Sequence, residues 1–255
     1  MSEANIFAFL NLGLEGIKPQ AGFFMPLLVG HLLGDFPLQP ASWVDERRRG
    51  VWRSSRLYLH ALVSGLLAGL AACLTAGTWR VAWVCPLVFL THALLDGVKS
   101  HVADTVRAFL LDQLAHLIVL AALAWLLVGS GEAPVNGHSA LWPLAACFLV
   151  LWWAAGIFIE KATSRWRGQL GVKDRERLQD AGLWIGRLER MLIFLFVLLQ
   201  RYEAIGFLVA AKSVFRLGEV TRADERNEAE YILVGTMASF LIAILTGIAF
   251  RLWIS

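Results

Sequence analysis

Residues 106–129 read Val-Arg-Ala-Phe-Leu-Leu-Asp-Gln-Leu-Ala-His-Leu-Ile-Val-Leu-Ala-Ala-Leu-Ala-Trp-Leu-Leu-Val-Gly, a run whose charged side chains all lie near its start. From Leu117 onward it has none. A helix needs about 20 apolar residues to cross a hydrocarbon layer of ~30 Å, and this run is long enough. It therefore predicts a membrane-spanning helix that carries Asp112 and His116 near one end.

Similar runs recur along the 255-residue chain, which is 58% hydrophobic and only 17% charged. Soluble proteins are nearer ~45–50% apolar and ~25% charged. We therefore predict an all-α, polytopic integral membrane helical bundle of about eight transmembrane or re-entrant helices. The first and seventh are short, so either a full crossing or a re-entrant segment fits them. The predicted spans are 22–38, 57–76, 80–98, 106–129, 140–160, 184–200, 204–217 and 231–253.

Positive charge is uneven between the predicted loops. Residues 40–56 and 161–177 are rich in Lys and Arg, whereas 130–139 has neither. Cytoplasmic loops carry an excess of Lys and Arg. We therefore expect both basic loops on the cytoplasmic side and the N-terminus outside.

A single membrane domain, 1–255, is the simplest organisation, because no linker or internal repeat marks a second one. The N-terminus lacks the basic region and cleavage site of a secretory signal. We expect an interfacial helix in 1–21, a metal-site half in 22–129, and C-terminal helices with a basic cluster in 140–255.

Other features bear on packing and on partners. Gly30-x-x-x-Gly34 and Gly65-x-x-x-Gly69 each put two glycines on one helix face, which lets a neighbouring helix approach closely. The three cysteines are single residues inside apolar runs, and we interpret them as packing residues. A net charge of +3 is too small to indicate nucleic acid as a partner.

Three histidine–aspartate pairs share one spacing on three predicted spans. Residues four apart on an α-helix lie on the same face, so each pair directs an imidazole and a carboxylate the same way. An ionised side chain near the bilayer centre costs roughly 2.5–3.5 kcal/mol, and such residues usually face the bundle interior and have a partner. The pairs are His31 with Asp35, His92 with Asp96, and Asp112 with His116.

In the predicted topology these residues lie near the inner ends of their spans, and His60 starts the second span at the same level. Divalent cations would neutralise the carboxylates, and the mixed nitrogen and oxygen ligands suit zinc, manganese or iron. We therefore predict a site for one or two divalent metal ions. The predicted ligands are His31, Asp35, His60, His92, Asp96, Asp112 and His116, of which Asp35, Asp96 and Asp112 are also candidate catalytic groups, with Gln39, Lys99 and Gln113 as candidate substrate-binding residues.

Two other interpretations of the pairs stay open. Each histidine could bond its own aspartate, or the pairs could join helices by hydrogen bonds. The same groups could instead form a proton or ion pathway through the membrane.

A second charged cluster lies in the C-terminal half. Arg187 and Arg190 are three residues apart, and Lys212 and Arg216 are four apart. Each pair can project from one helix face and hold an anion such as a phosphate. Basic residues that snorkel to the membrane surface would give the same pattern without a ligand. The candidate substrate-binding residues here are Arg187, Glu189, Arg190, Lys212 and Arg216.

Four motifs carry a family resemblance: His-Leu-Leu-Gly-Asp-Phe-Pro-Leu-Gln at 31–39, Thr-His-Ala-Leu-Leu-Asp at 91–96, Leu-Asp-Gln-Leu-Ala-His at 111–116 and Ala-Ile-Gly-Phe-Leu-Val-Ala-Ala-Lys-Ser at 204–213. In these the chain resembles the bacterial inner-membrane family catalogued as domain of unknown function 3307. The resemblance implies a multi-pass protein of the bacterial inner (cytoplasmic) membrane, without an assigned activity. His92-x-x-x-Asp96 after a threonine is also distantly similar to a motif of membrane-bound metal-dependent hydrolases.

These observations favour a membrane-embedded metal-dependent hydrolase that acts at the cytoplasmic face on a lipid-linked or amphipathic phosphoester, ester or amide. Besides the lipid bilayer, the expected partner is a lipid or anionic amphipathic substrate, and the sequence does not indicate an oligomeric state. A metal-ion or proton-coupled transporter is the main alternative, but its path should reach the other membrane face, where polar residues are lacking. A noncatalytic membrane scaffold would leave the three pairs without a role.

Overall fold

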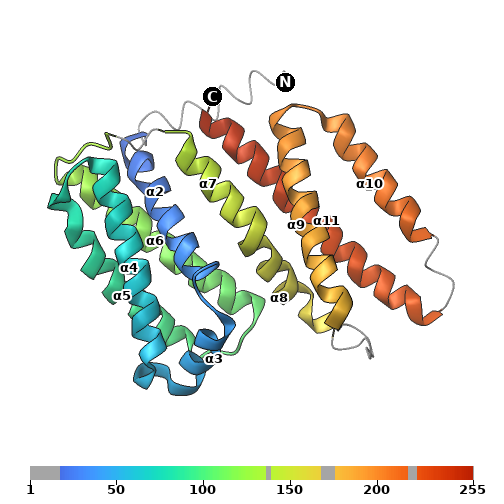
Figure 1. The fold of residues 1–255 in the computed structure, drawn as a ribbon, viewed down its shortest axis with the longest axis horizontal. Coiled ribbons are helices and arrows are strands. Elements are labelled where there is room, and N and C mark those ends of the chain that lie inside the picture. Colours follow the sequence, from blue (N-terminus) through green and yellow to red (C-terminus); the bar gives the residue numbers. More distant parts are fainter. Residues whose placement is uncertain (1–17, 136–138, 168–175, 218–222, 255) are drawn as a thin grey trace. The chain divides into compact units, whose positions relative to one another are not determined.

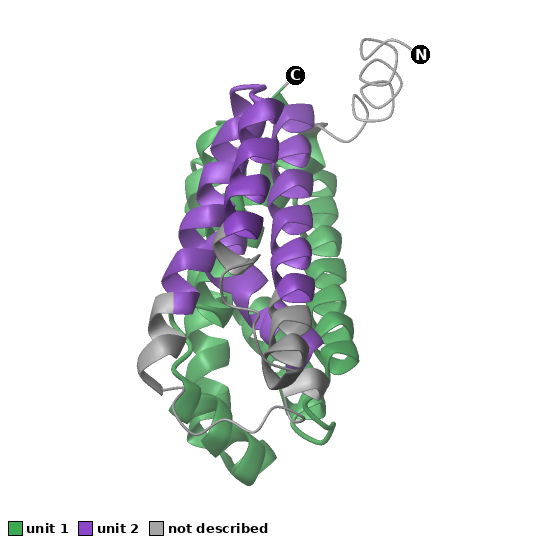
Figure 2. Ribbon diagram, turned by 90° about the vertical axis from the view of Figure 1, so that its right-hand side faces the viewer, with its two compact units in different colours: residues 1–149, 254–255 green, residues 150–253 purple. Residues whose placement is uncertain are grey.

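The computed structural model describes residues 18–135, 139–167, 176–217 and 223–254. Within these residues every regular element is a helix, and no strand is present. The chain divides into two compact units, which we call unit 1 and unit 2 and describe separately (Figures 1 and 2). Unit 1 comprises residues 1–149 with 254–255, and unit 2 comprises residues 150–253. The all-α prediction is confirmed, and the organisation as one membrane domain stays a prediction.

The helices of unit 1 are α2 (Lys18–Asp35), α3 (Ala41–Gly50), α4 (Ser55–Ala76), α5 (Val84–Lys99), α6 (Val106–Gly129) and α7 (Leu141–Leu149), with 3-10 turns at Val51–Arg53 and Trp79–Trp83. Those of unit 2 are α8 (Ala155–Arg167), α9 (Glu176–Leu198), α10 (Tyr202–Leu217) and α11 (Ala223–Ile254), preceded by a π-helical turn at Val150–Ala154. In unit 1, helix α2 packs against α4, α6 and α7, and α5 packs against α4 and α6.

Five described segments are long and apolar enough to cross a membrane: Ser55–Ala76, Trp79–Lys99, Val106–Gly129, Leu141–Ser164 and Leu233–Ile254. They coincide with five of the eight predicted spans. Helices α2, α9 and α10 coincide with the other three but are not among the five, and α10 has only 16 residues. Eight crossings are therefore not confirmed.

The first predicted span differs from the helix found there. Helix α2 runs from Lys18 to Asp35 rather than over 22–38. Its end follows from Pro37, because a proline disfavours helical backbone at the residue before it, here Phe36. The interfacial helix expected in 1–21 falls mainly on residues 1–17, which lie outside the described part of the chain.

Glycines set how closely the helices of unit 1 approach one another, as their spacing predicted. A Cβ added to Gly65 would lie 2.7 Å from the carbonyl oxygen of Cys85, and one added to Gly30 would lie 3.2 Å from the backbone of Leu67. At Gly65 no side chain fits unless α4 and α5 separate. The small residues therefore bring helix backbones into direct contact.

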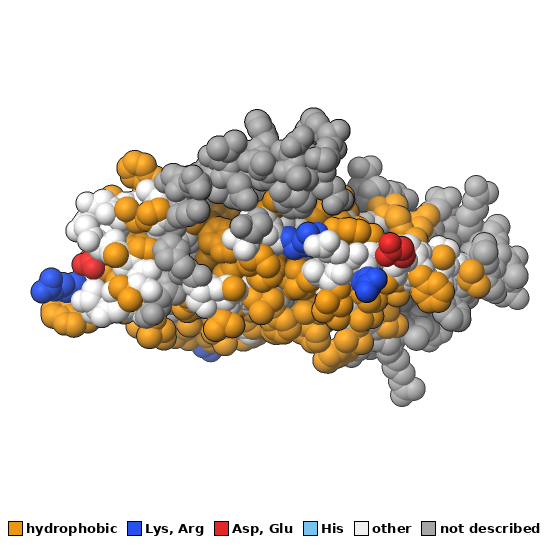
Figure 3. All heavy atoms as spheres, turned by 90° about the horizontal axis from the view of Figure 1, so that it is seen from above, with side chains coloured by type: hydrophobic (Ala, Val, Ile, Leu, Met, Phe, Trp, Pro, Cys, Tyr) orange, Lys and Arg blue, Asp and Glu red, His pale blue; other side chains and the backbone are white. Residues whose placement is uncertain are grey.

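Apolar side chains fill unit 1 at one end of its helices and also cover much of the outside. The buried cluster includes Phe23 and Leu27 from α2, Ala68 from α4, and Leu123 and Leu127 from α6. Among the described side chains visible in Figure 3, hydrophobic ones predominate and charged ones are few. An apolar exterior is the surface expected of helices that face lipid.

The contact at Gly65 gives a stability prediction. Gly65→Ala should lower the free energy of unfolding by about 1–3 kcal/mol, because the new methyl group must push α4 away from α5. Thermal unfolding in detergent measures the effect. Gly206→Ala is the control, since a Cβ there meets no atom within 4 Å, and it should be neutral or stabilising. Equal unfolding temperatures for the two variants would contradict the proposed close packing.

Candidate metal centre

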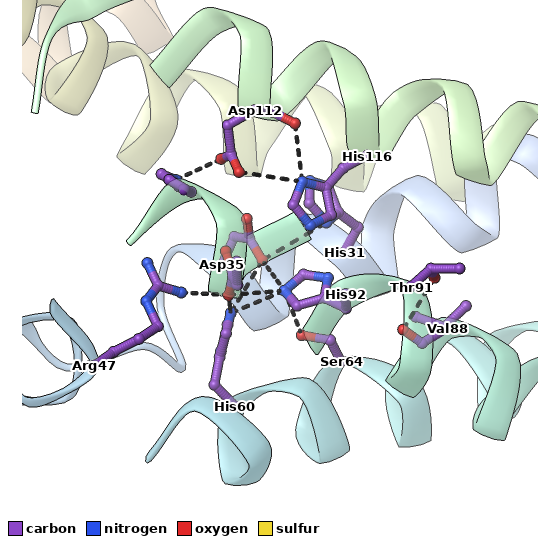
Figure 4. Close-up of polar contacts among 12 residues, drawn as sticks. His31, Asp35, Arg47, His60, Ser64, Val88, Thr91, His92, Asp112 and His116 are labelled. Carbon is purple, nitrogen blue, oxygen red and sulfur yellow. Dashed lines mark hydrogen bonds and ion pairs between the residues drawn. The ribbon is translucent and has the colours of Figure 1, made fainter. Parts of the chain in front are cut away.

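The seven histidines and aspartates predicted as ligands lie together in unit 1. Figure 4 labels all of them except Asp96. All seven side chains are at most 8% exposed. They are His31 and Asp35 on α2, His60 on α4, His92 and Asp96 on α5, and Asp112 and His116 on α6. The structure thus brings together residues that are far apart in the sequence, and their roles stay predictions.

Close packing of α2 on α4 explains part of this arrangement. A Cβ on Gly34 would lie 2.6 Å from the hydroxyl oxygen of Ser64, so the two helices touch at this level. Asp35 directly follows Gly34, and His60 lies one helical turn before Ser64. The Asp35 Oδ1 and His60 Nε2 atoms are consequently 3.5 Å apart.

Four atoms from three helices lie around His92 Nε2, and we call them the quartet: Asp35 Oδ1, His60 Nε2, His92 Nε2 and Asp96 Oδ2. The two imidazole nitrogens are 3.0 Å apart. Asp35 Oδ1 lies 3.2 Å from His92 Nε2, and Asp96 Oδ2 lies 3.4 Å from His60 Nε2 and 3.6 Å from His92 Nε2. Ligands held ~2.0–2.1 Å from a tetrahedral ion stand about 3.3–3.4 Å apart. Five separations within the quartet are therefore close to those around one such ion. Its members fall in two overlapping groups of mutually close ligands, His31 with Asp35 and His92, and His60 with His92 and Asp96.

Hydrogen bonds alone do not satisfy the quartet. His92 Nε2 faces the other three members of the quartet at once, yet a neutral imidazole nitrogen offers either one proton or one lone pair. Asp35 Oδ1 is buried and has no hydrogen-bond partner in the described structure. Leaving such a group unpaired in an apolar interior is costly. A central cation would instead accept a lone pair from every member.

Asp112 and His116 lie beside the quartet as a second group. The His116 Nδ1 atom lies 2.9 Å from the Asp112 backbone carbonyl, to which it can donate its proton. That bond leaves the Nε2 lone pair free, and Nε2 is buried without a partner in the described structure. A fixed tautomer with an available nitrogen is typical of a histidine ready to bind a metal. Asp96, Asp112 and His116 offer ligand atoms within 4.8 Å of one another.

A buried arginine that the sequence analysis missed contacts the quartet. Arg47 on α3 is 4% exposed, and its Nη1 group pairs with the Asp96 carboxylate. Its sequence context, Arg47-Arg48-Arg49, was interpreted only as a sign of topology. Since three adjacent arginines point in different directions around a helix, the pattern alone could not identify the inward one.

Three polar residues predicted near the site do line it. The Lys99 ammonium pairs with the Asp112 carboxylate. The Gln113 amide nitrogen donates to Asp35 Oδ2 at 3.2 Å and to Asp112 Oδ2 at 3.3 Å. The Gln39 amide, in its better-paired orientation, has its oxygen 3.1 Å from Arg47 Nη1. These contacts orient the carboxylates, and direct binding of a substrate stays a prediction.

A small cavity adjoins the site on the side of the apolar core. It has room for about one water. Its lining includes His31, Ser64, His92 and His116, and apolar side chains from α4, α5 and α6 complete it. The position beside His92 could thus take a water molecule.

In unit 2, the predicted anion-binding arginines contact backbone carbonyls. The π-helical turn alters the regular hydrogen bonding of its helix. Arg187 Nε donates to the Trp152 carbonyl at 3.0 Å, and Arg190 Nε donates to the Leu151 carbonyl at 2.6 Å. Arg190 is 4% exposed and also donates to the Ser239 hydroxyl. Both arginines therefore stabilise the turn, and anion binding by them stays a prediction.

The other predicted residues of this cluster form an ion pair. Lys212 Nζ lies 2.5 Å from Glu189 Oε2, so each charge has a partner within unit 2. Arg216 belongs to α10, but its side chain lies outside the described part of the structure. The predicted phosphate clamp is therefore neither confirmed nor contradicted.

The contacts of Arg190 predict a structural effect. Arg190→Ala should destabilise the protein by about 1–3 kcal/mol, because it leaves the buried Leu151 carbonyl without its donor. The unfolding temperature in detergent would report this loss. Arg201→Ala, an exposed arginine of the same unit, is the matched control and should unfold like the wild type. An unchanged Arg190→Ala protein would mean that the turn does not need the arginine.

Comparison with known proteins bears on the half of the chain that contains this centre. A search of curated proteins and a search of solved structures each returned no match. The distant similarity to membrane-bound metal-dependent hydrolases therefore stays a prediction from a few residues. A family model does match residues 23–140, which include all seven candidate ligands. The matching model is that of the family described as "Protein of unknown function (DUF3307)", to which this part of the chain is similar.

Proposed function

We propose that the chain is a membrane-embedded hydrolase that depends on a divalent metal ion held by Asp35, His60, His92 and Asp96. The observation that carries the proposal is that five separations within the quartet lie between 3.0 and 3.6 Å. Two imidazole nitrogens and two carboxylate oxygens suit zinc, with manganese and iron as alternatives. The candidate ligand groups found among the described residues contain histidines and aspartates and no cysteine.

The chemistry of such a site favours hydrolysis. A bound divalent ion supplies a nucleophile by lowering the pKa of its water from 15.7 to about 7. The cavity beside His92 has room for that water, which would be a fifth ligand in addition to the four quartet atoms, since zinc can expand to five ligands. Asp112 Oδ1 and His116 Nε2 are buried and lack hydrogen-bond partners in the described structure. Either atom could take the proton that the water releases, and we assign this role to Asp112.

The apolar end of unit 1 argues against a transport path. Beyond the cavity, most buried side chains of α2, α4 and α6 are apolar, among them Phe23, Leu27 and Leu127. The polar groups buried there are few, Thr75 and the side-chain oxygen of Gln20 among them. An ion or proton relay across a membrane uses polar or ionisable residues along its way. The arrangement therefore fits a site that works from one side better than a channel or carrier.

Positively charged side chains near the metal centre support hydrolysis at the cytoplasmic face of the bacterial inner membrane. Exposed arginines lie on α3 and the turn after it, including Arg49 and Arg53. Clusters of Arg beside membrane helices mark the cytoplasmic side and attract anionic lipid head groups. A lipid-linked or amphipathic ester, amide or phosphoester at the inner leaflet is the substrate class that we propose.

The metal content of the purified protein tests whether the quartet binds a divalent ion. The purified wild type should hold a divalent transition metal that Asp35→Asn and His92→Ala lack, since losing even an outer partner of a ligand costs roughly 10–100-fold in affinity. Elemental mass spectrometry measures it. His101→Ala is the control, because His101 is exposed in the loop after α5. Equal metal content in all four proteins would exclude the quartet as the site.

Hydrolysis assays test whether the bound metal ion supports the proposed reaction. Metal-stripped and reloaded protein should differ in hydrolysis of micellar chromogenic esters, amides and phosphodiesters, with activity only in the reloaded form. Asp112→Asn should keep its metal and lose roughly 10²–10⁴-fold in kcat, the usual contribution of a general base. Metal-ion uptake into vesicles containing the protein, without hydrolysis of any of these substrates, would favour a transporter instead.

A further inference from the structure

The metal centre has a candidate position for a second cation. Asp96 belongs both to the group with His60 and His92 and to the group with Asp112 and His116. A carboxylate shared by two ligand groups could bridge two ions, and two-metal hydrolases hold their ions ~3.5–4 Å apart. Geometry alone therefore allows either one ion or two.

A lysine already supplies positive charge at the second position. The Lys99 ammonium pairs with the Asp112 carboxylate, and the lysine is only 20% exposed. Its Nζ also lies 6.0 Å from the centre of the Phe109 ring, within the range of a cation–π contact. Both partners belong to α6, whereas Lys99 ends α5. The ammonium is thus held inside the bundle instead of reaching for solvent.

The net charge of the metal centre depends on whether it holds one divalent ion or two. Within the described part of unit 1, the centre combines three carboxylates with the cations of Arg47 and Lys99. With neutral histidines, this leaves one negative charge. One divalent ion would turn it into one positive charge, which a metal-bound hydroxide would neutralise. Two ions would leave three positive charges in an apolar interior, where unpaired charge is strongly disfavoured.

We infer that the centre takes a single divalent ion in the quartet, with the Lys99 ammonium in place of a second ion, and that its substrates are carboxylic esters or amides. This inference rests on the proposed hydrolase function. Single-ion zinc hydrolases such as the metalloproteases polarise a carbonyl, whereas paired ions suit in-line displacement at phosphorus because they stabilise both the attacking and leaving oxygens. One ion beside a fixed ammonium therefore favours carbonyl chemistry.

The reaction that follows balances without any other reactant. The water oxygen forms a bond to the carbonyl carbon as Asp112 takes one proton from it. The bond from that carbon to the alcohol oxygen or amine nitrogen breaks, and the leaving atom receives the proton from Asp112. The products are a carboxylic acid and an alcohol or amine, and no oxidant or reductant is needed.

Zinc stoichiometry of the purified full-length protein, reloaded with excess zinc and desalted, tests the inference. The wild type should bind one zinc ion per chain, and Lys99→Met should bind two, a twofold rise. Lys99→Arg keeps the positive charge and should stay at one. Lys212→Met is the matched control, because Lys212 forms a similar half-buried ion pair with Glu189 outside this centre, and it should also stay at one.

The outcomes separate this inference from the proposed function. Two zinc ions in the wild type, or one in Lys99→Met, would overturn the role of Lys99 and leave a metal hydrolase possible. No zinc in the wild type would instead remove the proposed metal site itself. With one zinc bound, the loaded wild type should hydrolyse chromogenic esters or amides at least tenfold faster than phosphodiesters, and the opposite preference would overturn the substrate class.

Discussion

Buried aspartates among apolar helices require positive charge close to them, and this requirement organises unit 1. Asp35, Asp96 and Asp112 lie where water cannot solvate them, so each needs a partner supplied by the fold. Arg47 meets Asp96, Lys99 meets Asp112, and the amide of Gln113 reaches Asp35. For Asp35 no such Lys or Arg contact exists in the described structure, and its Oδ1 atom faces histidine nitrogens. A metal ion bound in the quartet would supply the positive charge beside Asp35.

Close contacts between the helices of unit 1 bring the candidate ligands together. Gly34 lets α2 touch α4 beside Asp35, and Gly65 lets α4 touch α5. With larger residues there, the helices would stand further apart and the separations in the quartet would no longer match one ion. Packing and ligand geometry are therefore coupled. In unit 2, by contrast, buried Arg190 stabilises a π-helical turn, so a buried charge there has a structural explanation.

Much of this could be predicted from the sequence, because helix periodicity is a local property. The i, i+4 spacing of His31 with Asp35 and of His92 with Asp96 defined common faces, and hydropathy gave their level in the bundle. Features that depend on contacts between distant parts of the chain could not be predicted. Arg47 could not be told from its two arginine neighbours without the packing of α3 on the bundle, and the π-helical turn at Val150–Ala154 leaves no clear mark in an apolar run. The contacts of Arg187 and Arg190 with that turn were missed for the same reason.

X-ray absorption spectroscopy of the zinc-loaded protein examines the quartet most directly, since it reports the atoms around the ion. We predict four protein nitrogen or oxygen ligands and one water oxygen about 2.0–2.2 Å from zinc, with the outer-shell scattering of two imidazole rings. The imidazole signal should fall by half in His60→Ala loaded to the same zinc content. Sulfur ligands near 2.3 Å, or a spectrum without imidazole scattering, would contradict it.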